Sequence, residues 1–561
     1  MTTKLALAWL SRIGGGPFVV VSNDIDDDGV DAVLASPVVA AVIGRLPRSA
    51  QLDPDRCADL SAHALPRRVA REVFFLGDPA QHTISLLARL LAAGARAAVW
   101  PLPEGGIARR PLWELTCERG LASSRLALRS ALVRSAPLGS ALVSRGEQER
   151  AALIADALAR LPVPARDASA ATSIVIATSS LRMGGSERQA VNLACGLQAQ
   201  GRETSLVVHG RAADGDPSLL ADLRSAGVPV ADLLAPPEPR ERVDNEAAFI
   251  RAALAAEPWF ATLVTAWTVH LRRARPGTLQ AFLDEPNVAA GVGAVLAGVP
   301  RVVLSGRSLA PTHFDVYRPW QRPGYRWLLR QPGVVLANNS NAGARSYAEW
   351  LGISPSDVVV IPNGSRPLPA VDPARSAALR ARVARGAHDR LVGTIARLGD
   401  GKDPDVFVAV AAEVVRRVPG VRFVWFGGGP RPARRAARHV VFAGPTTKRE
   451  EALGALDVFL LTSRAEGLPN VLIEAAQTGL PIVTTDAGGA REAVEPGVNA
   501  LVCPVGAVEE LTGAVVRALT DDAFIASARA RGPTIAAERF SVDAMVASYQ
   551  ALYDSHSRHQ A

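Results

Sequence analysis

Two glutamates, Glu466 and Glu474, stand eight positions apart in the segment AEGLPNVLIEAAQTG. The pattern around them predicts a buried strand over 457–463, a tight loop, and a helix that has Pro469 in its first turn and ends at Gly479. We therefore expect both carboxylates near the crevice at the carboxyl end of a parallel sheet. Carboxylates accept hydrogen bonds from sugar hydroxyls, and a helix N-terminus attracts phosphate. The segment predicts a sugar-nucleotide site, although the spacing alone also fits two surface glutamates that flank a helix start.

A second group of chemistry-bearing residues lies upstream of these glutamates. The strand-loop segment VGTIARLGDGKDPDV carries Arg397 and Lys402 in a glycine-containing loop before a helix. Two cations beside free backbone N–H groups suit a diphosphate, because they neutralise its charge without a metal. The later run VRFVWFGGGP places Gly427 and Gly428 in a loop that could pass beside a nucleotide. A surface turn explains this glycine run equally well.

The composition bounds the classes of protein that can carry these motifs. With 561 residues, of which 48% are apolar and 21% charged, the chain is globular and long enough for about three domains. Its 4 cysteines lie far apart without metal-ligand or disulfide spacing, which favours a reducing, cytoplasmic compartment. No apolar run reaches the ~18 residues of a spanning helix, so we expect neither a signal peptide nor a transmembrane segment.

The net charge of +8 comes mostly from arginine. Such an excess suits a phosphate-bearing ligand or an anionic membrane surface, while a solvated helix face is the simpler explanation for any single cluster. No RNA-binding signature or DNA-reading helix motif is present, so we expect no nucleic-acid partner.

Short β-rich runs alternate with Ala/Leu-rich amphipathic stretches along the chain, which is typical of parallel sheets flanked by helices. Two passages rich in Pro, Ala and Ser, at 161–173 and 361–376, each precede a fresh first strand. The sequence therefore predicts an α/β protein with three parts, at 1–165, 166–370 and 371–561.

Several ordered motifs over about 166–550 resemble those of the family 4 retaining glycosyltransferases of the GT-B fold. They include the Glu466–Glu474 segment, the Arg397/Lys402 pair, and the runs MGGSERQAVNLACGLQAQG, LAGVPRVVLSGRS and DAGGAREAVEPGVNALVCP. The resemblance implies two Rossmann-like domains that face each other across a cleft, an acceptor-side domain at 166–370 and a donor-side domain at 371–561. It also implies a C-terminal helix that returns to the acceptor-side domain, and it makes residues 1–165 an additional α/β domain.

The resemblance implies a role for each matching residue. Arg397 and Lys402 would hold the donor diphosphate, Glu474 would accept hydrogen bonds from the ribose, and Glu466 would face the transferred sugar. A UDP- or GDP-sugar would donate to a saccharide or lipid-linked acceptor with retention of configuration, and no metal or other cofactor is expected. The remaining donor contacts implied are Gly467, Leu468, Pro469, Asn470, Gly427 and Gly428, with Gly184 and Gly185 closing the cleft from the other side.

One position departs from the family pattern. Many members carry a histidine after a strand of the acceptor-side domain, whereas this chain has Arg307 in VVLSGRSLAP. Arginine cannot act as a base at neutral pH, but it could bind an acidic sugar or a phosphate of the acceptor. Pairing with a nearby carboxylate is the alternative. We expect structural or surface roles for the neighbouring His270 and His313.

Residues 1–165 carry weaker signals, with strands predicted in PFVVV, REVFF and RAAVW and a helix between the last two. Asp24, Asp26 and Asp28 imitate the start of a calcium loop, but the twelfth position is Ala35 where a glutamate is needed. An acidic turn is therefore the expected structure. This part could serve a partner protein, the membrane or the acceptor polymer.

Two other functions remain open alongside the transferase. A sugar-nucleotide 2-epimerase shares the fold and needs no acceptor, and a catalytically silent subunit would bind nucleotide without turnover. The segment SGRSLAPTHFDVYRPW is similar to transferases of capsule and exopolysaccharide assembly of the Vi-antigen type. That similarity implies a cytoplasmic protein at the inner face of the membrane, within a polysaccharide-assembly complex of capsule, exopolysaccharide or lipopolysaccharide synthesis.

Overall fold

The computed structural model describes residues 137–165, 172–182, 184–234, 245–314, 317–384, 386, 389–429 and 438–555, together with six short strands between residues 18 and 111. The chain divides into two compact units, Met1–Glu147 and Gln148–Ala561. The calcium-like run from Asp24 to Asp28, and Ala35, lie outside the described residues.

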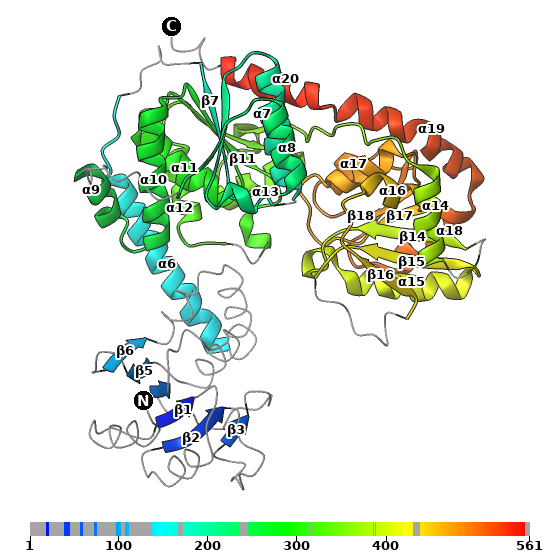
Figure 1. Ribbon diagram of the computed structural model, residues 1–561, viewed down its shortest axis with the longest axis horizontal. Helices are drawn as coiled ribbons and strands as arrows, with labels where there is room; N and C mark the ends of the chain where they lie inside the picture. The colour runs from blue at the N-terminus through cyan, green and yellow to red at the C-terminus, as the bar shows by residue number, and fades with distance from the viewer. Residues whose placement is uncertain are drawn as a thin grey trace. The chain divides into compact units, whose positions relative to one another are not determined.

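The first unit contains a six-stranded sheet in the order β3-β2-β1-β4-β5-β6 (Figure 1). Five strands are parallel and β6 is antiparallel to β5. The strands predicted in PFVVV, REVFF and RAAVW correspond to β1, β4 and β5, while the helix predicted between the last two lies outside the described residues. The bounds are β1 (Phe18–Val21), β2 (Val39–Gly44), β3 (Cys57–Asp59), β4 (Glu72–Phe75), β5 (Ala97–Pro101) and β6 (Ile107–Pro111).

The second unit holds two further sheets, and every strand pair in both is parallel. The middle sheet has the order β13-β12-β11-β10-β7-β8-β9. Apolar cores cover both of its faces, one built with α10 to α13 and the other with α7, α8 and α20. Its strands are β7 (Ile174–Thr178), β8 (Thr204–Val208), β9 (Val230–Asp232), β10 (Thr278–Phe282), β11 (Arg301–Gly306), β12 (Val334–Asn338) and β13 (Val358–Val360). The helices are α7 (Gly185–Ala199), α8 (Pro217–Ser225), α9 (Asn245–Ala253), α10 (Pro258–Ala274), α11 (Asp284–Leu296), α12 (Gln321–Leu328) and α13 (Asn341–Leu351).

The C-terminal sheet has the order β16-β15-β14-β17-β18-β19 and is likewise covered on both faces (Figure 1). Its strands are β14 (Arg390–Ile395), β15 (Val421–Phe426), β16 (Val440–Gly444), β17 (Val458–Leu461), β18 (Ile482–Thr485) and β19 (Ala500–Cys503). The helices are α14 (Pro373–Val383), α15 (Pro404–Arg417), α16 (Arg449–Gly454), α17 (Asn470–Gln477), α18 (Val508–Thr520) and α19 (Asp522–Arg539). Parallel strands buried on both faces confirm the predicted α/β class.

The last helix, α20 (Val542–Ser555), leaves the C-terminal sheet and packs on the middle sheet. Val546 and Tyr549 are fully buried there, and Gly196 of α7 leaves room for the Val546 side chain. Within the part of the chain that the structure describes, no helix is both long and apolar enough to cross a membrane.

The helix α6 (Pro137–Ala159) runs from the first unit into the second. Ile154 and Leu158 are fully buried in the core beside α10 and α11, and Leu161 joins them after the helix ends. The predicted boundary at residue 165 therefore falls inside the second unit, because the Pro-rich passage that marked it follows a helix whose end is already part of the core.

Candidate functional site

A cavity of about 330 Å³ lies in the second unit, lined by loops that follow strands of the middle and C-terminal sheets. Arg307 follows β11, Arg397 follows β14 and Glu466 follows β17, so the carboxyl ends of parallel strands meet there, as predicted. The cavity brings together most of the predicted site residues: Gly185, Arg307, Arg397, Lys402, Glu466, Gly467, Leu468, Pro469, Asn470 and Glu474.

Glu466 is held in a fixed position at the cavity wall. Its side chain is buried, and its Oε1 accepts hydrogen bonds from Ser463 Oγ at 2.6 Å and from Lys402 Nζ. Gly467 follows it because space is limited: a Cβ there would approach the Arg307 carbonyl oxygen and lie 2.7 Å from Ser308 Cα. The loop can therefore pass close to β11 only with glycine at this position.

Glu474 lies about one turn into α17, where Arg188 of α7 donates a hydrogen bond to its carboxylate. Arg449 Nε lies 3.6 Å from the same oxygen. Burial raises the pKa of the Glu474 carboxyl to about 7, and the Arg449 charge opposes that rise. Both predicted carboxylates thus lie against cations, Glu466 against Lys402 and Glu474 against two arginines.

Lys402 lies in a short 3-10 turn, Asp400–Lys402, whose exit is fixed by Asp403. Asp403 has a φ of 48°, pairs with Arg464 at 2.6 Å and caps α15 through the Val406 N–H. Aspartate tolerates this left-handed conformation better than most residues, so the chain can turn sharply directly after Lys402. The turn places the lysine side chain at the cavity wall.

Arg397 lines the same cavity, and its charge acts on the carboxyl of Glu187 in α7. Burial raises the pKa of the Glu187 carboxyl, and the charge of Arg397 counteracts that rise. The loop between β14 and α15 therefore supplies both positive charges, Arg397 and Lys402, at one wall of the cavity.

The start of α17 is anchored by amide side chains. Asn363 Nδ2 donates to the Leu468 carbonyl at 2.8 Å and to Asn470 Oδ1 at 2.7 Å, and Asn470 Nδ2 donates to the Gly185 carbonyl at 3.3 Å. Pro469 precedes the helix as its N-cap, one position earlier than predicted, because its ψ of 109° is extended. The helix still begins within the predicted segment, so the N–H groups of its first turn come from that segment.

Three predicted glycines do not line the cavity: Gly184, Gly427 and Gly428. Gly184 is the N-cap of α7. A Cβ at Gly427 would lie 2.7 Å from the Ala396 carbonyl carbon, and the Gly428 carbonyl accepts from Leu398 N–H at 2.8 Å. Gly427 and Gly428 therefore support the segment that carries Arg397, which is a structural role.

Arg307 points its guanidinium at neutral groups. It donates to Asn363 Oδ1 and, at 3.5 Å, to Tyr549 Oη, and it lies over the Phe282 ring at 5.3 Å from the centroid. The alternative prediction, a carboxylate partner, is not met among the described residues. His270 packs edge-on against Trp267 and His313 ends a short 3-10 turn; neither lines the cavity.

Arg188, Asn363 and Arg449 are among the cavity residues that were not singled out from the sequence. Arg188 ends the GGSER run directly after the predicted glycines, so its position in that motif was an available signal. Arg449 stands in a charged stretch, TKREE, that is typical of an exposed helix start, and only the fold brings it to Glu474.

Among the residues that the structure describes, no group of three His, Cys, Asp or Glu side chains could hold a metal ion. A metal-free mechanism stays a prediction. In it, the positive charges of Arg397 and Lys402 would neutralise the diphosphate in place of a metal ion.

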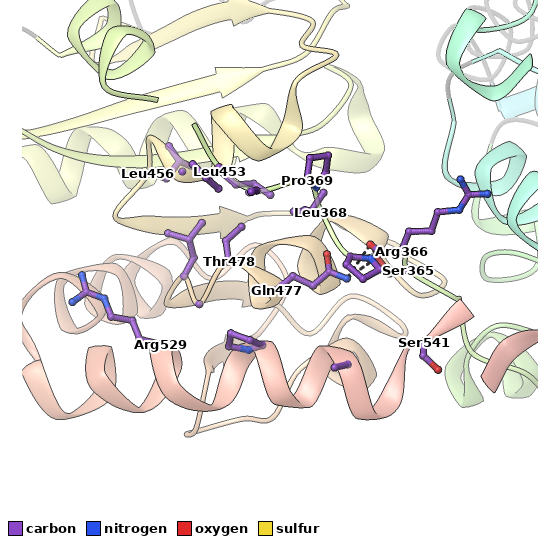
Figure 2. A pocket seen from close by; sticks show the side chains of 18 of the residues that line it. Ser365, Arg366, Leu368, Pro369, Leu453, Leu456, Gln477, Thr478, Arg529 and Ser541 are labelled. Carbon is purple, nitrogen blue, oxygen red and sulfur yellow. Dashed lines mark hydrogen bonds between the residues drawn. The ribbon is translucent and has the colours of Figure 1, made fainter. Parts of the chain in front are cut away.

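Figure 2 shows a second, larger pocket of about 1000 Å³, which lies between the linker at 365–371, the end of α17 and α19. Gln477 bridges its wall by donating to Ser365 Oγ and the Arg366 carbonyl, both at 3.2 Å. Its lining is mainly aliphatic, with Leu368, Leu453 and Leu480, and it contains none of the predicted site residues. The charged residues that could bind a nucleotide sugar gather in the smaller cavity.

The second unit matches two family models. Residues 184–364 match the glycosyl transferase 4-like domain, and residues 389–521 match the glycosyl transferases group 1. Together these matches cover more than half of the chain, and each includes one wall of the cavity.

The relatives of the chain include transferases and a polysaccharide-biosynthesis protein. The chain is 31% identical over 247 residues to the Vi polysaccharide biosynthesis protein VipC/TviE of Salmonella typhi, a match that spans 42% of each chain. It is 33% identical over 278 residues to a GDP-mannose-dependent alpha-(1-6)-phosphatidylinositol monomannoside mannosyltransferase of Mycobacterium tuberculosis, covering 45% of this chain and 71% of that protein.

Solved structures share the fold of the second unit. The Anabaena protein Alr3699/HepE, solved in complex with UDP and glucose, aligns with a TM-score of 0.54 and 20% identity over 69% of this chain and 100% of its own. Sucrose-phosphate synthase from Thermosynechococcus elongatus aligns with a TM-score of 0.53 and 17% identity, over 69% of this chain and 99% of its own.

Proposed function

Because the chain belongs to the family 4 glycosyltransferases of the GT-B fold, we propose that it transfers a sugar from a UDP- or GDP-sugar to a saccharide or lipid-linked acceptor with retention of configuration. The observation that carries this proposal is the cavity that joins two buried carboxylates, Glu466 and Glu474, to Arg397, Lys402 and the start of α17. Carboxylates accept from sugar hydroxyls, and cations bind phosphate.

Each group takes one part of the donor. Glu474 accepts hydrogen bonds from the ribose hydroxyls, which replace the Arg188 guanidinium as its donors. Glu466 faces the transferred sugar. Lys402 releases the Glu466 carboxylate and binds the diphosphate instead, beside Arg397. The first N–H groups of α17 add to this positive field because they lack partners within the helix.

The reaction needs no protein nucleophile. The bond between the anomeric carbon and the β-phosphate oxygen breaks, and both electrons go to the departing diphosphate. An acceptor hydroxyl forms the new bond on the same face, and a diphosphate oxygen takes its proton. Negative charge grows on the diphosphate in the transition state, so preplaced cations stabilise that state more than the bound donor.

The biological setting is proposed from the relatives. Similarity to a Vi polysaccharide biosynthesis protein supports a role in capsule, exopolysaccharide or lipopolysaccharide synthesis. The location that we propose for this role is the cytoplasmic side of the membrane, at its surface. The mannosyltransferase relative is named for GDP-mannose, so GDP-sugars stand beside UDP-sugars as candidate donors.

Release of nucleoside diphosphate from a panel of UDP- and GDP-sugars tests this function, with and without EDTA. We expect donor turnover that EDTA leaves unchanged. Lys402→Ala and Arg397→Ala should each lower turnover about 100- to 1,000-fold, more than they weaken donor binding. Arg416→Ala, on an exposed face of α15, serves as the charge control and should keep the wild-type rate.

Activity abolished by EDTA and restored by manganese, with Lys402→Ala near the wild-type rate, would contradict the mechanism. Nucleotide binding without any turnover would identify the silent binding subunit instead. Isomerisation of the donor without an acceptor would identify the epimerase.

A further inference from the structure

Arg307 differs in its partners from three other cations of the cavity, Arg188, Lys402 and Arg449. Arg188 and Lys402 each bind a glutamate, and Arg449 lies within 4 Å of Glu474. The contacts of Arg307 within the described residues are an amide, a phenol and an aromatic ring, all of them neutral. A buried charge is costly unless an opposite charge accompanies it.

The Arg307 side chain is also not fully hydrogen-bonded. Its Nε is buried without a hydrogen-bond partner in the described structure, and its bond to Tyr549 is long, at 3.5 Å. Burial lowers the pKa of this guanidinium, although Tyr549 opposes that shift. The Nε–H therefore lacks a partner, and the Nη1–H makes only a long bond, on a group that an anion would stabilise.

The position of Arg307 points to the sugar rather than to the diphosphate. The proposed diphosphate ligands, Arg397 and Lys402, follow a strand of the C-terminal sheet, whereas Arg307 follows β11 of the middle sheet. Its main chain packs against Gly467, directly beside Glu466, which faces the transferred sugar in the proposed function. A planar guanidinium binds a carboxylate through two parallel hydrogen bonds, which a lysine cannot do.

We propose that Arg307 binds a carboxylate carried by the reacting saccharide, so that the enzyme handles an acidic sugar. This inference rests on the proposed transferase function and names its substrate class. The carboxylate has two possible sources, the transferred sugar of the donor or the acceptor sugar next to it. Both present the same chemistry to Arg307, and the two arms of one binding experiment separate them.

The donor arm measures the affinity of wild type, Arg307→Gln and Arg307→Lys for UDP, UDP-glucose and UDP-glucuronic acid by calorimetry, with GDP, GDP-mannose and GDP-mannuronic acid in parallel. Glutamine can still donate to Asn363 but carries no charge, and lysine keeps the charge without the planar fork. If the donor carries the acid, wild type should bind the acidic sugar nucleotide at least tenfold more tightly than the neutral one. Arg307→Gln should lose that preference and Arg307→Lys should lose most of it, while affinity for the free nucleoside diphosphate stays unchanged.

The acceptor arm uses wild type saturated with nucleoside diphosphate and compares glucuronic acid oligosaccharides with neutral glucose oligosaccharides. If the acceptor carries the acid, the acidic oligosaccharide should bind at least tenfold more tightly, and Arg307→Gln should abolish the difference. Wild type without preference for the acid in either arm would overturn the proposal, whatever the folding of the variants. Loss of free-nucleotide affinity in a folded Arg307→Gln would also overturn it, by assigning Arg307 to the diphosphate.

Failure of the proposed transferase function has a different signature. In that case wild type binds none of the free nucleoside diphosphates, or it binds one but releases none from any neutral or acidic sugar nucleotide. A wild type that transfers a sugar from a UDP- or GDP-sugar but shows no preference for any acidic saccharide refutes only the role of Arg307.

Discussion

Glu474 and Glu466 carry the same chemical group in different surroundings. Glu466 accepts from a lysine and a serine, whereas Glu474 is buried on a helix between two arginines of which one belongs to α7. Burial outweighs the opposing charge of Arg449 and raises the pKa of Glu474 to about 7. This carboxyl therefore changes charge within the physiological pH range.

The raised pKa predicts a pH-dependent affinity for free nucleotide. The ionised carboxylate accepts ribose hydrogen bonds best, so affinity should rise as pH increases through 7. If binding requires the ionised form, UDP or GDP should bind about tenfold more tightly at pH 8 than at pH 6. Calorimetry at both pH values checks this for wild type and Glu474→Gln. The variant lacks the titrating carboxyl, so any pH dependence that it retains comes from other groups of the protein or the nucleotide. Equal pH dependence in the two proteins would refute the assignment.

At the residue scale, the sequence predicted the site residues that lie in or next to one local segment. Glu466, Glu474, Arg397 and Lys402 each lie beside a glycine-containing loop at a strand end, and local patterns reveal such loops. Arg188 could not be paired with Glu474 in the same way, because 286 residues separate them and only the fold joins their helices. The partners that set the charge of a site are therefore harder to predict than the site itself.

At the scale of elements, the loop before α17 depends on a close backbone approach. A Cβ on Gly467 would meet the main chain of Arg307 and Ser308, so the two loops would have to separate. Gly467→Ala should cost about 1–3 kcal/mol of unfolding free energy and weaken nucleotide binding. Denaturant unfolding and calorimetry together measure both effects.

Gly513→Ala provides the matched control. Gly513 lies in the middle of α18 on its exposed face, and a Cβ there would meet nothing within 4 Å. It should stabilise the protein by up to about 1 kcal/mol and leave nucleotide affinity unchanged. Wild-type behaviour of Gly467→Ala in both measurements would show that the two loops are not held together.

Elements were predictable where hydrophobic period and turn residues agree. The strand before Glu466 and the helix that ends at Gly479 were predicted from such agreement, and Gly479 has the left-handed φ of 70° that ends a helix. The end of α6 was not assigned to the core of the second unit. The apolar positions of a helix have the same spacing whether the helix packs on its own domain or on the next one. Its partners, in α10 and α11, lie about a hundred residues downstream.

At the scale of the whole molecule, the division after Glu147 predicts where the chain can be cut. A chain that starts at Gln148 keeps Ile154 and Leu158 in the core and should fold with full nucleotide affinity, because every proposed donor contact lies in the second unit. A chain that starts at Leu161 loses those side chains and should be less stable by several kcal/mol, at about 2–5 kcal/mol per large buried aliphatic group.

Thermal unfolding and nucleotide calorimetry of the two truncated proteins test this division. Acceptor use or recovery with membranes should decline in both, if residues 1–147 serve the acceptor or the membrane. A folded chain from Gln148 that no longer binds nucleotide would show that the first unit contributes to the donor site.

The central claim is that the cavity binds a nucleotide sugar through separate roles of its two carboxylates. The measurement that tests it most directly is the affinity of wild type, Glu474→Ala and Glu466→Gln for UDP, GDP and ADP, with the matching sugar nucleotides. One free nucleoside diphosphate should bind wild type, and Glu474→Ala should weaken it by about 1.5–3 kcal/mol because the ribose loses a charged acceptor. Glu466→Gln should bind that nucleotide normally and turn over its sugar donor slowly. Equal losses of free-nucleotide affinity in both variants, or no binding by wild type, would contradict the account.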